Sequence, residues 1–201
     1  MVKMLTFLQT IRALKALPRS GWLSHGVGVR DVESVADHSF SVSAISLLLA
    51  DLELKRGAQV DVEKVLRMAL LHDLAESLTF DISKAYLRYL GKRGEEIKHE
   101  IEHSAWSMLI KGLNNPELAR KYTRVESEYN SNETPESKIV HAADGLDILL
   151  QIIGYQQRGY AKSSLAELWR GTATGLKQSQ VPSTKKLLKA IMQENSGRSI
   201  R

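Results

Sequence analysis

The sequence predicts an all-α fold, on three observations. Apolar residues recur at helical spacing along most of the chain, strand-like alternation is absent, and helix start and stop signals separate the apolar stretches. The clearest start signal is Thr134-Pro135, where a side chain that caps a helix precedes proline at the first helical position. We therefore expect helices throughout and no sheet of consequence.

The N-terminal part of the chain predicts two helices around an irregular segment. The first helix carries one apolar stripe, formed by Leu5, Leu8, Ile11 and Leu14. Pro18 and Gly21 end this helix, and residues 18–33 are expected to be irregular. Ser34 fits the N-cap of the next helix, which should run to Leu54.

The rest of the chain predicts further helices. Asp61 fits the N-cap of a helix that runs to about Leu78, and residues 80–94 are mixed because Gly91 and Gly94 interrupt the pattern. The remaining helices are expected at residues 95–110, from Pro116, from Thr134-Pro135 to about Gln157, near 164–169 and near 183–193.

The composition fits a single domain over residues 1–201, with core motifs at 34–148 and a C-terminal helical extension from about residue 161. The chain is 43% hydrophobic and 25% charged, which is the balance of a globular protein. Residues 1–17 lack the apolar run of a signal peptide, and no stretch approaches the roughly 20 apolar residues of a membrane span. We expect a cytoplasmic protein without a membrane partner.

Two features of the composition limit the chemistry. The chain has no cysteine, which excludes disulfides, zinc ribbons and cysteine nucleophiles, so any metal must be held by His, Asp or Glu. The formal charge of +5 fits an anionic ligand, a nucleic acid or neither. Much of the excess lies near the C-terminus, at Lys185, Lys186, Lys189, Arg198 and Arg201, where a solvated tail is the simplest interpretation.

Ionisable residues interrupt three apolar helix faces: His38, the pair His72-Asp73, and Asp144. Burying an unpaired carboxylate costs several kcal/mol, so such groups need partners. Two histidines and two aspartates can surround one divalent ion, and their N and O atoms suit Mn, Co, Zn, Ni or Fe. On a continuous helix, His72 and Asp73 both reach such an ion, and Glu76 lies one turn beyond His72.

The order of these residues resembles the H…HD…D signature of the HD superfamily of metal-dependent phosphohydrolases. Three stretches narrow the resemblance to the HD-domain 5′-deoxynucleotidase family: Pro18-Arg19-Ser20-Gly21-Trp22, Glu33-Ser34-Val35-Ala36-Asp37-His38 and Leu71-His72-Asp73-Leu74-Ala75-Glu76. The resemblance to this family runs from about Leu5 to about Tyr160. The resemblance implies an HD-domain helical bundle around a buried divalent metal, and a 5′-nucleotidase that releases phosphate from (deoxy)nucleoside 5′-monophosphates.

The resemblance also implies a role for each matched residue. The metal ligands of the family are matched by His38, His72, Asp73 and Asp144. Glu76 matches the carboxylate that works with the attacking water, and Asp81 matches an aspartate near the leaving group. Arg19 and Trp22 match residues that contact the phosphate and the nucleoside. The family usually has glycine before that aspartate where this chain has Phe80, which bears on substrate choice.

The residue chemistry agrees with these roles, but structural interpretations stay open beside them. A divalent ion lowers the pKa of bound water, a carboxylate orients or deprotonates that water, and arginine offers phosphate a planar fork of donors. Alternatively, Asp81 caps a turn, Arg19 is a surface cation and Trp22 packs under its loop. His99 and His103 have a metal-ligand spacing too, but a solvated charged face accounts for them.

The functional alternatives come from two classes. Among enzymes they are a nucleoside triphosphate hydrolase and a cyclic-nucleotide phosphodiesterase. The non-enzymatic alternative is a nucleotide or nucleic-acid binding module, although a small nucleotide is the expected ligand and nucleic acid is not. We expect a homodimer, by the resemblance and because small enzymes often form twofold pairs, with Trp106, Ile152 and Tyr155 as contact candidates.

Overall fold

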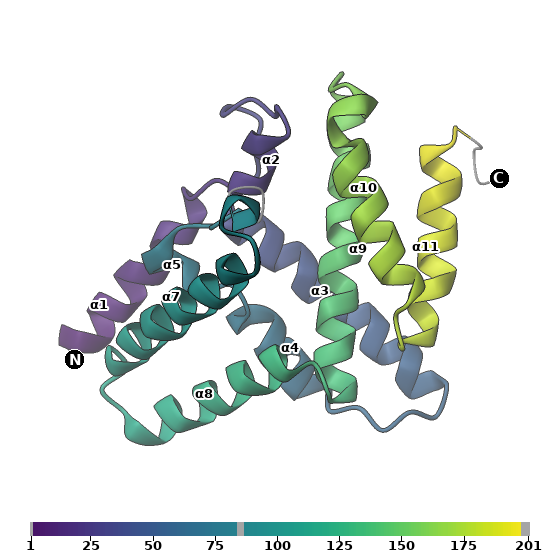
Figure 1. Ribbon diagram of the computed structural model, residues 1–201. Helices are drawn as coiled ribbons and strands as arrows, with labels where there is room; N and C mark the ends of the chain where they lie inside the picture. Colours follow the sequence, from purple (N-terminus) through teal and green to yellow (C-terminus); the bar gives the residue numbers. More distant parts are fainter. Residues whose placement is uncertain (1, 84–86, 198–201) are drawn as a thin grey trace. The chain divides into compact units, whose positions relative to one another are not determined.

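The computed structural model describes residues 2–83 and 87–197, and it confirms the all-α prediction (Figure 1). Over these residues there is no β-strand, only an isolated bridge between Pro18 and Ser34. The helices are α1 (Val2–Ile11), η1 (Arg12–Lys15), α2 (Ser20–Ser24), α3 (Val35–Lys55), α4 (Val62–Leu71), α5 (Glu76–Thr79), η2 (Arg88–Leu90), α7 (Lys92–Lys111), α8 (Pro116–Ser131), α9 (Pro135–Gln157), α10 (Lys162–Lys177) and α11 (Pro182–Asn195).

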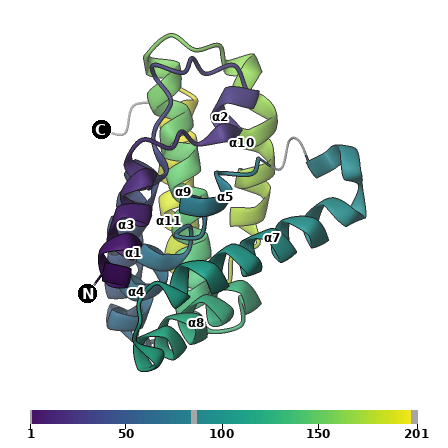
Figure 2. The ribbon, with the colours of Figure 1, turned by 90° about the vertical axis from the view of Figure 1, so that its left-hand side faces the viewer.

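The chain divides into two compact units. The first comprises Met1–Ser39 and Leu70–Ser127, and the second comprises Phe40–Ala69 and Glu128–Arg201. In the first unit, α1, α5 and α7 pack against one another. In the second, α10 and α11 both pack against α9, as the views of Figures 1 and 2 agree in showing. Helices α10 and α11 occupy the range expected for the C-terminal extension, whereas a single domain stays a prediction.

The start signals read from the sequence are confirmed. Ser34 and Asp37 bond reciprocally: the backbone N–H of Asp37 donates to Ser34 Oγ (3.1 Å), and that of Ser34 donates to Asp37 Oδ2 (2.9 Å). Asp61 Oδ1 accepts from Lys64 N (3.0 Å), and Thr134 Oγ1 accepts from Ser137 N (3.2 Å). Each cap satisfies a backbone donor that the helix itself leaves without a partner.

The helix predicted from Asp61 to about Leu78 is not continuous, and that prediction is wrong. Helix α4 ends at Leu71, a turn occupies residues 72–75, and α5 follows. The turn is held by backbone bonds between residues three apart, Leu74 N to Leu71 O and Glu76 N to Asp73 O, both 3.1 Å. The helical spacing assumed for His72, Asp73 and Glu76 therefore does not apply.

Two other helix boundaries differ from the expectation. The segment predicted as irregular contains α2, with Gly21 inside it. Helix α7 begins at Lys92, so Gly94 lies within the helix instead of breaking it. A Cβ atom on Gly94 would clash with the carbonyl oxygen of Leu87, so this glycine allows a close packing that the sequence pattern does not reveal.

The three residues predicted as homodimer contacts lie in the interior of the chain, so the choice of these contact residues is wrong. The homodimer itself stays a prediction. Trp106 is 2% exposed and donates from its indole to Thr123 Oγ1 (3.2 Å). Ile152 and Tyr155, on α9, are fully buried. Apolar residues of this size at helical spacing are as typical of a core as of an interface.

One helix corrects the prediction that no stretch approaches a membrane span. By length and composition alone, α3 could cross a membrane, with a mean hydropathy of 1.3 over its most apolar window. A core helix of a soluble protein passes the same test, and α3 carries two buried ionisable residues, His38 and Glu53. The expected lack of a membrane partner stays a prediction.

Candidate functional site

Two local structures place the histidines of the candidate site. His38 lies in the first turn of α3, directly after the cap formed by Ser34 and Asp37, and it is 1% exposed. His72 and Asp73 begin the turn after α4, and the side chain of His72 is 1% exposed. In this turn the side chains of His72 and Asp73 lie close together, with His72 Nε2 3.3 Å from Asp73 Oδ2.

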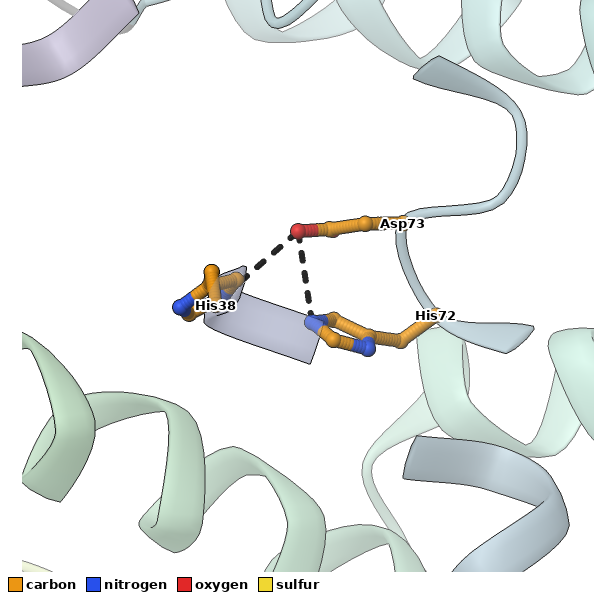
Figure 3. A group of neighbouring side chains, drawn as sticks. All are labelled: His38, His72 and Asp73. Atoms are coloured by element: carbon orange, nitrogen blue, oxygen red, sulfur yellow. Dashed lines mark ion pairs between the residues drawn. The ribbon is translucent and has the colours of Figure 1, made fainter. Parts of the chain in front are cut away.

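Three donor atoms converge there (Figure 3). Asp73 Oδ2 lies 3.3 Å from His72 Nε2 and 3.6 Å from His38 Nε2, and the two imidazole rings stand 5.5 Å apart, edge to face. All three atoms lie within 4.8 Å of one another, which is the reach of one divalent ion. Two imidazole nitrogens and a carboxylate oxygen are a donor set that such an ion binds, so the residues fit the metal that the sequence predicts.

Electrostatics keep Asp73 ionised, as a ligand must be. Burial works to raise the pKa of Asp73, but the charges of His72 and Arg19 outweigh it and hold that pKa well below its usual range. Arg19 supports this directly, because its Nη1 donates to Asp73 Oδ2 at 3.0 Å.

Glu76 behaves in the opposite way. It opens α5, is 6% exposed, and its Oε1 lies 3.8 Å from Arg19 Nη1. Its Oε2 is buried and has no hydrogen-bond partner within the described ranges. Burial, followed by the charges of Asp73 and Asp81, raises the pKa of Glu76 to about 9. A buried carboxyl group with a perturbed pKa is typical of groups that exchange protons, so this geometry suits an acid–base group.

Arg19 and Asp81 belong to loops that are tied together. The carboxylate of Asp81 accepts from the backbone N–H of Ser20 (2.6 Å), and Ser20 Oγ donates to the carbonyl of Asp81 (2.6 Å). Asp81 therefore caps α2, a helix 61 residues earlier, in place of the turn considered from the sequence. This link holds Arg19, the residue before Ser20, beside Asp73 and Glu76.

Trp22 does not offer an open face. The residue is 3% exposed, and its indole N–H donates to Glu33 Oε1 (2.6 Å). This burial matches the structural interpretation weighed for Trp22, that the ring packs under its loop. Asp144, the remaining predicted ligand, is half-buried on α9 in the second unit, and its role stays a prediction.

One charged residue near the site is absent from the sequence predictions. Lys98, on α7, forms an ion pair with Glu102 (3.2 Å), and α7 packs against α5. Burial works to lower the pKa of Lys98, but the charges of Glu102, Glu76 and Asp73 outweigh it, so the pKa is raised. In sequence, Lys98 is one of many charges on a helix, and nothing in the pattern separates it from them.

Comparisons with known proteins identify the family. Residues 11–184 match the family described as "HD domain". The chain is 30% identical to "5′-deoxynucleotidase HDDC2" of Danio rerio over 86% of this chain and 79% of that one. It is 34% identical to the crystal structure of the PH0347 protein from Pyrococcus horikoshii, over 95% and 98% of the two chains, with a TM-score of 0.74.

A further solved structure supports the fold. An HD-domain phosphohydrolase from Listeria innocua is 24% identical, with a TM-score of 0.78 over 94% of this chain and 87% of that one. The family match covers most of the chain and runs across both units. The chain therefore belongs to the HD-domain family and, within it, to the 5′-deoxynucleotidase group.

Proposed function

We propose that this protein is a metal-dependent 5′-nucleotidase that releases phosphate from deoxynucleoside 5′-monophosphates. The observation that carries the proposal is the convergence of His38 Nε2 and His72 Nε2 on Asp73 Oδ2, with Glu76 buried beside them. The similarity to 5′-deoxynucleotidases supports the substrate class.

In this proposal, His38, His72, Asp73 and Asp144 hold one divalent ion. The ion is one of Mn, Co, Zn, Ni and Fe, all of which this donor set suits. When bound, it supplies a water of lowered pKa and polarises a phosphoryl oxygen. Elemental analysis of the purified protein identifies it.

The chain's own residues perform the remaining steps. Glu76 orients the attacking water and, in its ionised form, takes a proton from it. Arg19 binds the phosphate oxygens. Its Nη1 lies beside the carboxylates of Asp73 and Glu76, so the phosphate anion must compete with Asp73 for Arg19. Asp81 acts on the leaving-group side. Its bonds to Ser20 hold the loop that carries Asp81 against the loop that carries Arg19.

The contribution of Trp22 is a supporting one in this proposal. Its buried ring and its bond to Glu33 fix the loop that carries Arg19. The homodimer and the cytoplasmic location expected from the sequence also remain proposals, and light scattering at micromolar concentration tests the first of them.

The test is a panel of ribo- and deoxynucleoside 5′-monophosphates, nucleoside triphosphates and cyclic nucleotides, each assayed with several divalent ions and with a chelator. We expect inorganic phosphate from deoxynucleoside monophosphates, abolition by chelator and recovery with Mn or Co. Pyrophosphate from a triphosphate, or a linear product from a cyclic nucleotide, would contradict the proposal. So would salt-sensitive binding of nucleic acid without turnover.

A further inference from the structure

Phe80 has an unusual backbone conformation. Its φ of 63° and ψ of 165° lie in a region that is occupied almost only by glycine. The conformation is held from both sides, because Phe80 N donates to Glu76 O (2.9 Å) and Thr79 Oγ1 donates to Phe80 O (3.0 Å). Glycine, which the family resemblance leads one to expect here, would adopt this conformation without strain.

Phe80 also lies at a particular place in the site. It follows α5, which begins with Glu76, and it precedes Asp81, whose carboxylate accepts from Ser20 N. Phe80 therefore lies between Glu76 and Asp81 in the chain, next to the residue that is bonded to the Arg19 loop. An aromatic side chain at this position is 68% exposed, so its ring faces solvent instead of packing in a core.

Among the described residues, the aromatic side chain expected at the site does not offer an open face. Trp22, the residue expected to contact the nucleoside, is 3% exposed and its N–H is bonded to Glu33. Among the large exposed apolar side chains described in the first unit, the aromatic ones are Phe80 and Tyr89. Of these two, Phe80 donates from its backbone N–H to the carbonyl oxygen of Glu76, a residue of the site.

We propose that Phe80 is the base-binding residue of this enzyme: its exposed ring stacks on the nucleobase of the bound nucleotide. A strained backbone with an exposed ring beside a catalytic site is typical of a residue kept for binding. Stacking on a flat face accepts any heteroaromatic base, so the expected ligands are purine and pyrimidine nucleotides alike, with purines gaining more. The inference rests on the proposed function and deepens it.

The experiment compares a nucleotide with a phosphate ester that has no base. Wild type, Phe80→Gly, Phe80→Leu and Phe80→Tyr are assayed on deoxyadenosine 5′-monophosphate and on deoxyribose 5-phosphate. We expect the ratio of kcat/KM between the two substrates to fall about tenfold in Phe80→Gly and Phe80→Leu, mainly through KM, and to be retained in Phe80→Tyr. Tyr89→Leu, which removes the other exposed ring, should leave the ratio unchanged.

Thermal stability separates binding from folding. Phe80→Gly should melt above wild type because it relieves the strain, whereas Phe80→Leu should not. A ratio that is unchanged in both variants, or that falls equally in Tyr89→Leu, would overturn the inference.

If wild type turns over neither substrate, the proposed function fails, but calorimetric binding of the same two compounds still tests Phe80. Tighter binding of the nucleotide that Phe80→Leu abolishes supports the inference. Equal binding of both compounds by wild type contradicts it.

Discussion

The two units of the chain bury acidic side chains in opposite ways. In the second unit, each buried glutamate has a specific partner: Glu53 accepts from Ser183 N (2.8 Å), and Glu136 accepts from Asp61 N (2.9 Å) and from Lys64 (3.1 Å). In the first unit, Asp73 and Glu76 lie near one arginine, and the pKa of Glu76 is raised. Burial alone therefore does not identify a functional acid in this protein.

The difference teaches which acids serve folding. A carboxylate that accepts from a backbone N–H at a helix start stabilises that helix, and its charge is satisfied locally. Glu53 does this for α11 and Glu136 does it for α4. Where a buried acid lies beside other acids, their charges disfavour its ionised form and raise its pKa, which suits proton transfer. Substitutions in the two units should therefore have different consequences.

The largest expected effect is on turnover, at Glu76. Glu76→Gln should lower kcat by about 10²–10⁴, the usual contribution of a positioned acid–base group, while the protein keeps its metal. The melting temperature should not fall, because a neutral amide replaces a carboxylate whose charge is disfavoured. The measurements are phosphate release, elemental analysis and thermal denaturation.

Glu53→Gln is the matched control, since Glu53 is as deeply buried as Glu76 but lies in the second unit. It should retain turnover. An emptied metal site in Glu76→Gln would show that Glu76 is a ligand, and full activity would show that it is not needed.

The next effect is on metal content, at Asp73. Asp73→Asn removes the charge on which His38 Nε2 and His72 Nε2 converge, so the bound ion should fall from about one per chain to nearly none after dialysis. Turnover should be lost with it, and excess Mn should restore only part of the rate. If Asp73→Asn keeps its metal, the ion is held elsewhere and the site assigned here is wrong.

A smaller effect, on stability alone, is expected at Glu53. Glu53→Ala leaves the buried N–H of Ser183 without its acceptor, which should lower the free energy of unfolding by about 1–3 kcal/mol. Denaturant titration measures the loss, and hydrogen exchange at the Ser183 amide should accelerate. Glu194→Ala removes an exposed acid of α11, the helix that contains Ser183, and should change neither the free energy of unfolding nor the exchange rate. Equal behaviour of the two variants would remove the structural role given to Glu53.

The smallest effect is pH-dependent and concerns Lys64. It pairs with Glu128 at 2.7 Å and with Glu136 at 3.1 Å. Burial works against the charges of Lys64 and Glu128, but their mutual attraction outweighs it, so the pKa of Lys64 is raised and that of Glu128 is lowered. Lys64→Met should cost about 1 kcal/mol at neutral pH.

The sign of the pH dependence follows from these two shifts. The raised pKa of Lys64 gives stability that is present below its ordinary value of 10.5 and is lost as pH rises through the folded value. The lowered pKa of Glu128 gives stability that is present above 4.5 and is lost as pH falls through the folded value. The difference between wild type and Lys64→Met should therefore be largest between these limits. A difference that is flat across all pH values, or equal to that of Lys186→Met, would contradict this.

The sequence predicted features that depend on interactions between residues near in the chain, and it did not predict features that depend on distant residues. Ser34, Asp61 and Thr134 were identified as helix caps because a cap bonds to a backbone group three residues away. The end of α4 at Leu71 could not be identified, since apolar residues at helical spacing continue beyond it. The role of Trp22 was also ambiguous, because burial of its ring depends on a loop folding around it.

By itself, the sequence determined that the chain is helical, where most helices begin, and that His38, His72 and Asp73 are candidates for one metal centre. These features depend on local backbone bonds and on the residue types present. The tertiary structure alone decided that a turn follows α4, that Asp81 caps α2 from 61 residues away, and that Glu76 resists ionisation. The physical reason is that desolvation and charge at a site are sums over groups distant in the chain, and their distances are set only when the chain folds.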